Sequence, residues 1–341
     1  MRIKLLGSAG VIRYSNEIYT NVKRLAGSKV AVSQNMYGTL PFLGAGMAFP
    51  LIASFKDYSN YDIVHNLPGY PLFFLKKKDV SMVTTVHEFQ SVLYPELNKI
   101  QEIGFKDKIW TNFVSKLGIK SAIASDLIIT NSIQTQKEAI SLGIPRKKTY
   151  LTELGVDSRF LKIPIRSKKA KKAFKIGFIG TLSPRKNVLF LINAFKKIED
   201  NELLLELWGK SIYSSKTIND AIGSDRRITW KGFAPETDFI DIYDSFDAFA
   251  YPSLYEGFGL PILEAKARGL PVILYKNGKI SPEVRHDCFE VENEEQLIDK
   301  ILELKSNGYN NRMRDKAVKN ARSFTWQKTA MKTLDAYHSL A

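Results

Sequence analysis

The chain has 341 residues, 44% of them hydrophobic, and a formal net charge of +15. This length suits two domains with ordinary hydrophobic cores. A single cysteine, Cys288, excludes an intramolecular disulfide and is typical of a reducing compartment. Residues 1–7 hold only a short apolar piece before a glycine, so we interpret them as a first strand and not as a signal peptide.

The positive charge is concentrated in the first half of the chain. Residues 1–157 carry a net charge of +7 and residues 158–175 a further +8, whereas residues 176–341 are neutral. This asymmetry favours an anionic partner for the N-terminal half, such as a membrane surface, a phosphorylated lipid or a nucleic acid. Lysine that only keeps the protein soluble is the alternative.

Strands and helices are predicted to alternate along the whole chain. Expected strands lie at residues 2–6, 29–32, 62–65, 80–87 and within 124–132, and then at 174–180, 203–208, 227–230, 246–250 and 272–274. This alternation predicts a parallel-sheet α/β fold in both halves. The polar, lysine-rich residues 158–173 are interpreted as a linker between a domain at 1–157 and a domain at 174–324. Residues 316–341 are expected to be helical, with a break at 323–326.

Two segments of the first half raise the question of a membrane. Residues 30–55 carry no charge, but two prolines and three glycines interrupt them, so we expect a loop with a short helix and not a spanning helix. Residues 106–123 show the spacing of a basic amphipathic helix. Packing of its apolar stripe into the domain is the first interpretation, and contact with a membrane surface is the alternative.

Residues 251–271 have the strongest features of a binding site. They follow an apolar strand, turn at two glycines and enter a helix with Pro261 in its first turn. Glycines let a ligand approach the backbone, and a helix N-terminus attracts phosphate. Glu256 and Glu264 flank the turn with seven residues between them. A surface loop followed by a buried helix is the alternative, because such turns are common.

Other strand ends carry polar groups as well. Arg185 and Lys186 follow the strand at 174–180, and this pair of cations suits a diphosphate. A weaker glycine-bearing turn lies at residues 7–16. His65 and His87 each end a strand, where ligands of open α/β sheets bind. A structural histidine with interior partners is the alternative for both.

Together these residues resemble a retaining glycosyltransferase of family four (group 1). Residues 252–265 match the E-x7-E signature of that family, and residues 180–187 resemble its diphosphate turn. Residues 85–96 are similar to the segment that holds its active-site histidine, residues 130–132 and 155–157 to the end of its first domain, and residues 324–326 to the start of its last helix. The resemblance implies the GT-B fold: two Rossmann-like parallel-sheet domains that face each other across a cleft. The N-terminal domain would bind the acceptor and include the helix at 325–341.

The resemblance also implies roles for single residues. A nucleotide sugar would bind the C-terminal domain, with Arg185 and Lys186 on the diphosphate, Glu264 on the ribose and Glu256 on the sugar. His87 would contact that sugar from the N-terminal domain. Catalysis is thus expected at His87, Glu256, Arg185 and Lys186, and donor binding at Gly10, Thr181, Arg185, Lys186, Glu256, Gly257, Phe258, Gly259, Leu260 and Glu264. The chain departs from the common pattern at Thr181, where many members have arginine, and at Glu88, where aspartate is frequent.

The chemistry that the resemblance implies is a front-face displacement with retention, in which the departing phosphate helps to deprotonate the acceptor. No Asp-x-Asp motif ends a strand, so we expect transfer without a metal and without a cofactor other than the donor substrate. The variant motifs look most like those of mannosyltransferases, which favours GDP-mannose as donor and UDP-glucose next.

The expected acceptor is a glycan or a lipid-linked glycan at the cytoplasmic face of the membrane, with the basic N-terminal half on anionic lipid. One alternative is an α/β protein that binds nucleotides or nucleic acid without transferring a sugar. The sequence offers no recognition helix or aromatic sheet for nucleic acid, which we therefore do not expect as a partner. A phosphorylase or an epimerase of the same fold is a further alternative. The missing signature for a lysine-anchored cofactor stands against a phosphorylase.

Overall fold

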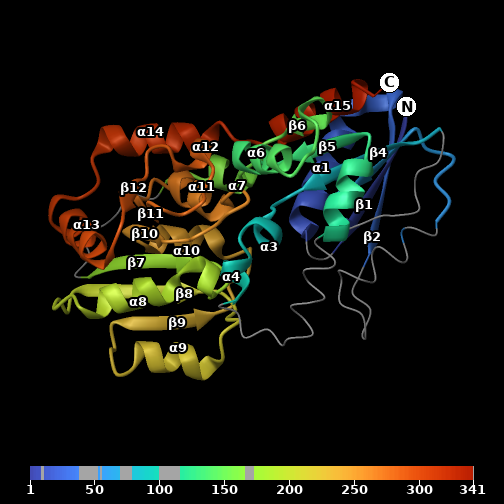
Figure 1. Ribbon diagram of the computed structural model, residues 1–341. Helices are drawn as coiled ribbons and strands as arrows, with labels where there is room; N and C mark the ends of the chain where they lie inside the picture. Colours follow the sequence, from blue (N-terminus) through green and yellow to red (C-terminus); the bar gives the residue numbers. More distant parts are fainter. Residues whose placement is uncertain are drawn as a thin grey trace. The chain divides into compact units, whose positions relative to one another are not determined.

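The computed structural model describes residues 1–8, 11–37, 53, 56–69, 79–99, 116–165 and 173–340. The chain divides into two compact units, each with its own parallel sheet and helices (Figure 1). The N-terminal unit comprises residues 1–95, 103–155 and 324–341. The C-terminal unit comprises residues 96–102 and 156–323. The last helix of the chain therefore belongs to the N-terminal unit.

The N-terminal unit is built on a six-stranded sheet of order β2-β1-β3-β4-β5-β6. Its strands are β1 (Arg2–Ser8), β2 (Ala31–Tyr37), β3 (Ile63–Asn66), β4 (Ser81–Val86), β5 (Leu127–Thr130) and β6 (Thr149–Leu151). All neighbouring strands pair in parallel. Every residue of β3 and β5 is buried, as expected for strands in the middle of a sheet that is covered on both faces.

Six helical segments lie wholly in this unit within the described residues. They are α1 (Ile12–Ala26), η2 (Gly27–Lys29), α3 (Gln90–Leu93), α6 (Ile133–Ser141), η3 (Arg146–Lys148) and α15 (Trp326–His338). A further short helix, α4 (Pro95–Lys99), begins at the boundary, and its residues 96–99 belong to the C-terminal unit. Helix α15 packs against α1. A Cβ on Gly155 would lie 2.1 Å from the backbone nitrogen of Trp326, so only glycine lets the chain pass the start of α15 so closely. Glu153 also holds α15, because its carboxylate lies 2.5 Å from Nζ of Lys332.

The C-terminal unit has a second six-stranded parallel sheet, of order β12-β11-β10-β7-β8-β9. Its strands are β7 (Phe174–Ile179), β8 (Leu203–Trp208), β9 (Ile228–Gly232), β10 (Ala248–Tyr251), β11 (Val272–Tyr275) and β12 (Phe289–Val291). Strand β10 is buried throughout. The ring of Tyr251 stacks on those of Phe178 and Phe249, each with centroids 5.6 Å apart, so the end of β10 is firmly packed.

Helices surround this second sheet. They are α7 (Ser158–Lys162), η4 (Pro184–Lys186), α8 (Val188–Lys196), α9 (Ser215–Ile222), α10 (Phe239–Ser245), α11 (Leu260–Ala267), α12 (Pro282–Arg285), α13 (Glu294–Asn307) and α14 (Asn311–Arg322). Side chains cap several of them, as Ser183 does at η4 and Asn310 at α14, and so define where they begin.

The predicted parallel α/β alternation is confirmed, with differences at the weakest elements. The strand predicted at residues 29–32 is β2, which begins later and runs on to Tyr37, because an edge strand with half-buried residues gives no clear period. Strands β6 and β12 were not predicted, since three residues are too short for a pattern. The apolar segment at 30–55 and the basic helix at 106–123 lie largely outside the described residues. Among the described helices, none combines the length and the apolar character that crossing a membrane requires.

Candidate functional site

The candidate site lies at the carboxyl ends of β7 and β10, which are neighbours in the parallel C-terminal sheet. The chain leaves β7 through Thr181 into η4, and it leaves β10 through residues 252–259 into α11. A backbone hydrogen bond of 2.8 Å from Leu254 N to Arg185 O joins the two turns. Parallel strands that end at one edge thus bring together two segments about 70 residues apart in sequence, as the doubly wound fold does for its ligands.

A buried ion pair forms the centre of this site. Lys186 Nζ lies 2.5 Å from Glu256 Oε1, and both residues are buried. Lys186 Nζ also donates to Tyr251 Oη at 2.5 Å, and Ser253 Oγ donates to the same carboxylate oxygen at 2.6 Å. Burial alone would raise the pKa of Glu256, but the charges of Lys186 and Arg185 outweigh it and hold that pKa below its usual value. The pair is therefore charged at neutral pH.

Arg185 stands beside this pair. Its Nη1 donates to the carbonyl oxygen of Tyr255 at 2.8 Å and lies 3.6 Å from Glu256 Oε2. Its side chain is 21% exposed, compared with 9% for that of Lys186. Two cations thus converge on one carboxylate, which leaves a net positive charge at the end of β7. An arrangement of this kind attracts a ligand with two negative charges.

Glu264 occupies the first turns of α11 and is almost fully buried. Its Oε2 accepts a hydrogen bond of 3.0 Å from Tyr243 Oη, which belongs to α10. The hydroxyl of a buried tyrosine thus fixes the direction of this carboxylate. Glu256 and Glu264 therefore have different surroundings, because cations neutralise the first and a neutral hydroxyl holds the second.

The turn between the two glutamates presents the start of α11. Gly259 is the N-cap residue of this helix and has φ of 108°, a backbone conformation that favours glycine. No side chain caps this helix terminus. Pro261 has no N–H, and Ile262 N donates to Gly259 O at 3.1 Å, so the N–H groups of Gly259 and Leu260 are the ones that can bind an anion here. Of the other residues predicted here, Gly257 and Phe258 are buried, Leu260 is half-buried and Thr181 is exposed. Gly10, predicted to close on the donor, lies outside the described residues.

His87 follows β4 in the N-terminal unit. Its Nε2 lies 2.8 Å from the carbonyl oxygen of Leu67, which can only accept, so Nε2 carries the proton and the neutral ring presents Nδ1 as an acceptor. Asn131 Nδ2 donates to the backbone oxygen of His87 at 3.0 Å. Burial lowers the pKa of His87, with the hydrogen bond to Leu67 opposing. The ring is therefore a neutral, fixed hydrogen-bonding group.

The sequence pattern missed several residues that shape the site. Tyr251, Ser253 and Tyr243 contact the charged groups described above, and only Ser253 lies within the glutamate signature. Phe233 follows β9 at the same edge of the sheet and is 63% exposed, with Lys210 Nζ 5.4 Å from its ring centroid. Exposed aromatic and basic residues directly after neighbouring strands were a signal that could have found this pair.

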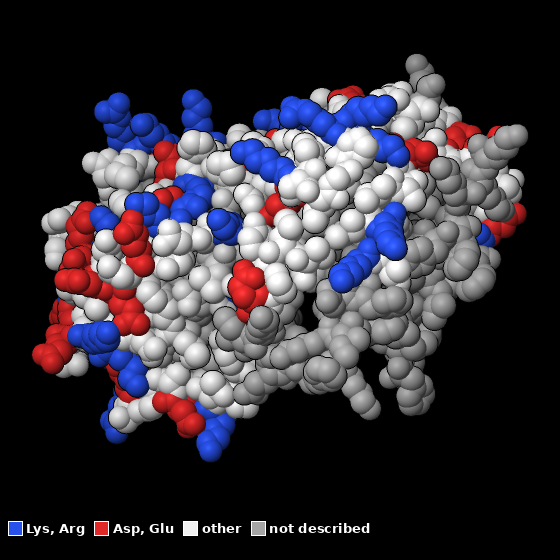
Figure 2. All heavy atoms as spheres, in the orientation of Figure 1, with Lys and Arg blue, Asp and Glu red and all other residues white. Residues whose placement is uncertain are grey.

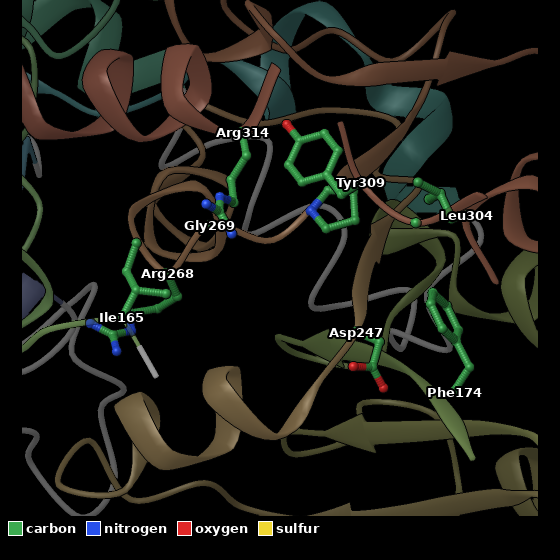
Figure 3. Close-up of a pocket in the computed structure, with 10 residues that line it drawn as sticks. Ile165, Phe174, Asp247, Arg268, Gly269, Leu304, Tyr309 and Arg314 are labelled. Carbon is green, nitrogen blue, oxygen red and sulfur yellow. The ribbon is translucent and has the colours of Figure 1, made fainter. Parts of the chain in front are cut away.

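A cavity of about 360 Å³ lies at the opposite edge of the C-terminal sheet (Figure 3). Phe174 begins β7, and Asp247 and Pro271 directly precede β10 and β11, so this cavity is lined by the amino ends of the strands. Arg268 lines it as well, but its guanidinium is occupied by the Asp244 carboxylate and by the carbonyl oxygens of residues 163 and 164. The cavity is thus not part of the candidate site.

The described residues contain no group of three or more His, Cys, Asp or Glu side chains arranged to hold a metal. The site consists instead of a charged pair, a second cation, a carboxylate and a helix terminus. These groups can bind a diphosphate and hydrogen-bond the hydroxyls of a sugar or ribose.

Comparison with known proteins agrees with this chemistry. Residues 160–324 match the family described as Glycosyl transferases group 1. The O-antigen chain mannosyltransferase B of Escherichia coli is 27% identical over 303 residues, which cover 84% of this chain and 76% of that enzyme. The D-inositol 3-phosphate glycosyltransferase of Corynebacterium glutamicum is 27% identical over 195 residues, 53% of this chain and 45% of that enzyme.

Solved structures share the fold over nearly the whole chain. A glycosyltransferase from Rickettsia africae has a TM-score of 0.72 at 18% identity and covers 99% of this chain and 98% of its own. HepE of Anabaena, solved with UDP and glucose, has a TM-score of 0.69 at 18% identity and covers 99% of this chain and 100% of its own. The two units have the GT-B fold. Residues 160–324 belong to the group 1 family, and the protein is a retaining hexosyltransferase that uses a nucleotide sugar.

Proposed function

We propose that this enzyme transfers mannose from GDP-mannose to a glycan or a lipid-linked glycan. The observation that carries the donor site is the Lys186–Glu256 ion pair, buried at the carboxyl ends of β7 and β10 beside the uncapped start of α11. The choice of mannose is supported by the similarity to the mannosyltransferase of Escherichia coli. The domain at 174–324 binds the donor in this proposal, and the domain at 1–157 with the helix at 325–341 binds the acceptor.

The donor contacts follow from the charges of the site. Arg185 and Lys186 bind the diphosphate, together with the N–H groups at residues 257–260 and the polar turn at Thr181. Glu264, directed by the hydroxyl of Tyr243, accepts hydrogen bonds from the ribose. The exposed ring of Phe233 stacks on the base.

The reaction breaks the bond between the anomeric carbon of the sugar and the β-phosphate oxygen. The acceptor oxygen forms the new bond on the same face, and its proton passes to the departing phosphate. Negative charge grows on that phosphate, so Lys186 and Arg185 act by stabilising it. Glu256 holds both cations in place and contacts a hydroxyl of the sugar. His87 offers Nδ1 to another sugar hydroxyl, which fixes the orientation of the ring.

The first experiment measures donor binding and transfer in matched variants. Glu264→Ala and Lys186→Ala are each expected to lower donor turnover by about 10²-fold or more, the effect of losing one preorganised charged contact. Lys197→Ala is the control for Lys186→Ala, because Lys197 pairs with Glu294 at an exposed surface. Turnover that is the same in Lys186→Ala and Lys197→Ala would refute the assigned role. Activity that persists in a chelator is the expected result for a reaction without a metal.

UDP-glucose is the second candidate donor. It is favoured by the structural similarity to HepE, which has been solved with UDP and glucose and with UDP-glucose. A thermal-shift series with GDP, UDP and ADP separates the candidates, since the diphosphate that binds the native protein raises its unfolding temperature. A larger shift with GDP supports GDP-mannose, and a larger shift with UDP transfers the proposal to UDP-glucose.

For the acceptor side, we propose that the basic N-terminal half binds an anionic membrane surface at the cytoplasmic face. Residues 1–157 and 158–175 hold the whole excess of positive charge. On the face shown in Figure 2, acidic side chains gather at the α13 end of the C-terminal unit, whereas basic side chains are spread over both units. Sedimentation with anionic vesicles is expected to fall as salt rises, and equal binding to neutral vesicles would contradict the proposal.

A further inference from the structure

A continuous chain of buried hydrogen bonds crosses the N-terminal unit from the last helix to the first. Tyr337 Oη of α15 lies 2.6 Å from His65 Nδ1, and His65 Nε2 lies 2.7 Å from Thr85 Oγ1. Thr85 Oγ1 lies 2.9 Å from Tyr14 Oη of α1. His65, Thr85 and Tyr337 are completely buried, and Tyr14 is 6% exposed. The four side chains come from β3, β4 and two helices, and the proposed donor contacts use none of them.

All three hydrogen bonds of this chain can form together when His65 is neutral. Burial lowers the pKa of His65 to about 3, so one ring nitrogen donates and the other accepts at neutral pH. Each of the four groups then has one hydrogen to give. Every one of the three bonds has one donor and one acceptor, whichever direction the chain takes. Because three bonds use three of the four hydrogens, the hydroxyl at one end of the chain keeps its hydrogen for a partner outside it. The interior of the chain is rigid, because turning the Thr85 hydroxyl would leave a buried partner unsatisfied.

The chain ends against the ring of His87. The Tyr14 and His87 rings meet edge to face, with centroids 4.8 Å apart and planes at 87°. Thr85, which anchors the hydroxyl of Tyr14, precedes His87 by two residues. The His87 ring is thus held at Nε2 by Leu67 and at its side by Tyr14. Displacing Tyr14 would let the His87 ring change its orientation while its hydrogen bond to Leu67 remained.

We infer that Tyr337, His65 and Thr85 are positioning residues that act through Tyr14 to fix the ring of His87 for its contact with the sugar. The inference rests on the role proposed for His87. In this inference the last helix contributes to catalysis indirectly. Its residue Tyr337 helps to orient His87, which follows β4, through buried hydrogen bonds.

The test is a double-mutant cycle on donor hydrolysis, with release of GDP from GDP-mannose and of UDP from UDP-glucose as the measured reactions. Tyr337→Phe removes one hydroxyl from the far end of the chain, and Tyr14→Phe removes the near hydroxyl while keeping the ring. Each is made in the native protein and in His87→Ala. We expect kcat to fall about tenfold in the native background with an unchanged donor KM, since misplaced catalytic groups lose rate more than binding. No further fall is expected in His87→Ala, because coupled residues are not additive.

Tyr58→Phe is the matched control. Tyr58 is a buried tyrosine of the same unit, and its hydroxyl lies 3.2 Å from that of Tyr37. The control loses a comparable interior hydrogen bond that is not part of the chain ending at His87. It is expected to lower the unfolding temperature as the test variants do and to leave kcat unchanged in both backgrounds.

A readout without turnover comes from the ring-nitrogen NMR shifts of His87. They are expected to move in Tyr337→Phe and to stay in Tyr58→Phe. Unmoved shifts, or an equal loss of kcat with and without His87, would overturn the inference. Loss of rate in His87→Ala with full rate in both tyrosine variants also overturns it, but leaves the proposed function intact. Full rate in His87→Ala would refute the role of His87 itself and the inference with it.

Discussion

The substitution Glu256→Gln tests the charged centre of the proposed donor site. It removes the carboxylate charge that faces Lys186 at 2.5 Å and Arg185 at 3.6 Å, while it keeps the size of the side chain. Lys186 then loses the charge of Glu256 and keeps the neutral hydroxyl of Tyr251 as a hydrogen-bond partner. The native protein is therefore expected to lose stability when no donor is bound.

The size of this loss follows from the burial of the pair. Removing one partner of a buried ion pair costs about 3–5 kcal/mol. The amide oxygen of glutamine can still accept from Lys186 and Ser253, so we expect a cost at the lower end, about 3 kcal/mol. For a unit of this size each kcal/mol shifts the unfolding temperature by about 2–4 °C, which gives a fall of about 6–12 °C.

A nucleoside diphosphate is expected to reverse part of this loss, because its phosphates supply the negative charge that Glu256 provided. The thermal shift caused by GDP or UDP should therefore be larger in Glu256→Gln than in the native protein. Donor turnover should nevertheless fall, since the contact with the sugar is lost. Binding and catalysis then change in opposite directions, which a merely unfolded variant could not show.

The assay is thermal unfolding with and without each diphosphate, followed by donor hydrolysis. Glu294→Gln is the matched control, because Glu294 pairs with Lys197 at an exposed surface and such pairs contribute about 0–1 kcal/mol. An unfolding temperature for Glu256→Gln within about 2 °C of the control would show that Lys186 does not depend on Glu256. If GDP or UDP raised the unfolding temperature equally in Glu256→Gln and in the native protein, the idea that the phosphates replace the charge of Glu256 would be refuted.

Three further predictions concern other parts of the protein. Tyr243→Phe removes the hydroxyl that donates a hydrogen bond to Glu264. Calorimetry is expected to show about tenfold weaker binding of the nucleoside diphosphate, which corresponds to one hydrogen bond to a charged group. Unchanged affinity would contradict this. His65 has a native pKa of about 3, below its usual value of about 6.5, so its unfolded form alone takes up a proton between these values. The contribution of His65 to the free energy of unfolding is therefore complete above pH 6.5 and declines below it, by about 2 kcal/mol at pH 5. Denaturant titrations at several pH values measure this decline, which His65→Gln should lack. Arg268→Met leaves Asp244 buried without its cation and should lower the free energy of unfolding by about 3–5 kcal/mol, a loss that a double variant with Asp244→Leu should largely recover.

Much of the fold could be predicted from local patterns. Parallel strands buried on both faces give short apolar runs, and glycines and helix caps mark the turns between them. The α/β alternation could therefore be predicted from the sequence alone. The signature with Glu256 and Glu264 could also be recognised in the sequence, because its residues are contiguous and form one turn and one helix. Short strands such as β6 and β12 escaped, since three residues carry too little periodicity to be distinguished from loop.

The sequence by itself determined the resemblance to group 1 glycosyltransferases, the parallel α/β class and the residue types of the proposed donor site. Only the tertiary structure decided which of those residues meet. Lys186 and Glu256 are 70 residues apart and are paired by the adjacency of β7 and β10, and His65 and Tyr337 are 272 residues apart and are paired by the packing of α15 on the N-terminal unit. Such pairings depend on strand order and on helix packing, which arise from burial summed over a whole unit. These pairings therefore cannot be predicted from any short segment of the sequence.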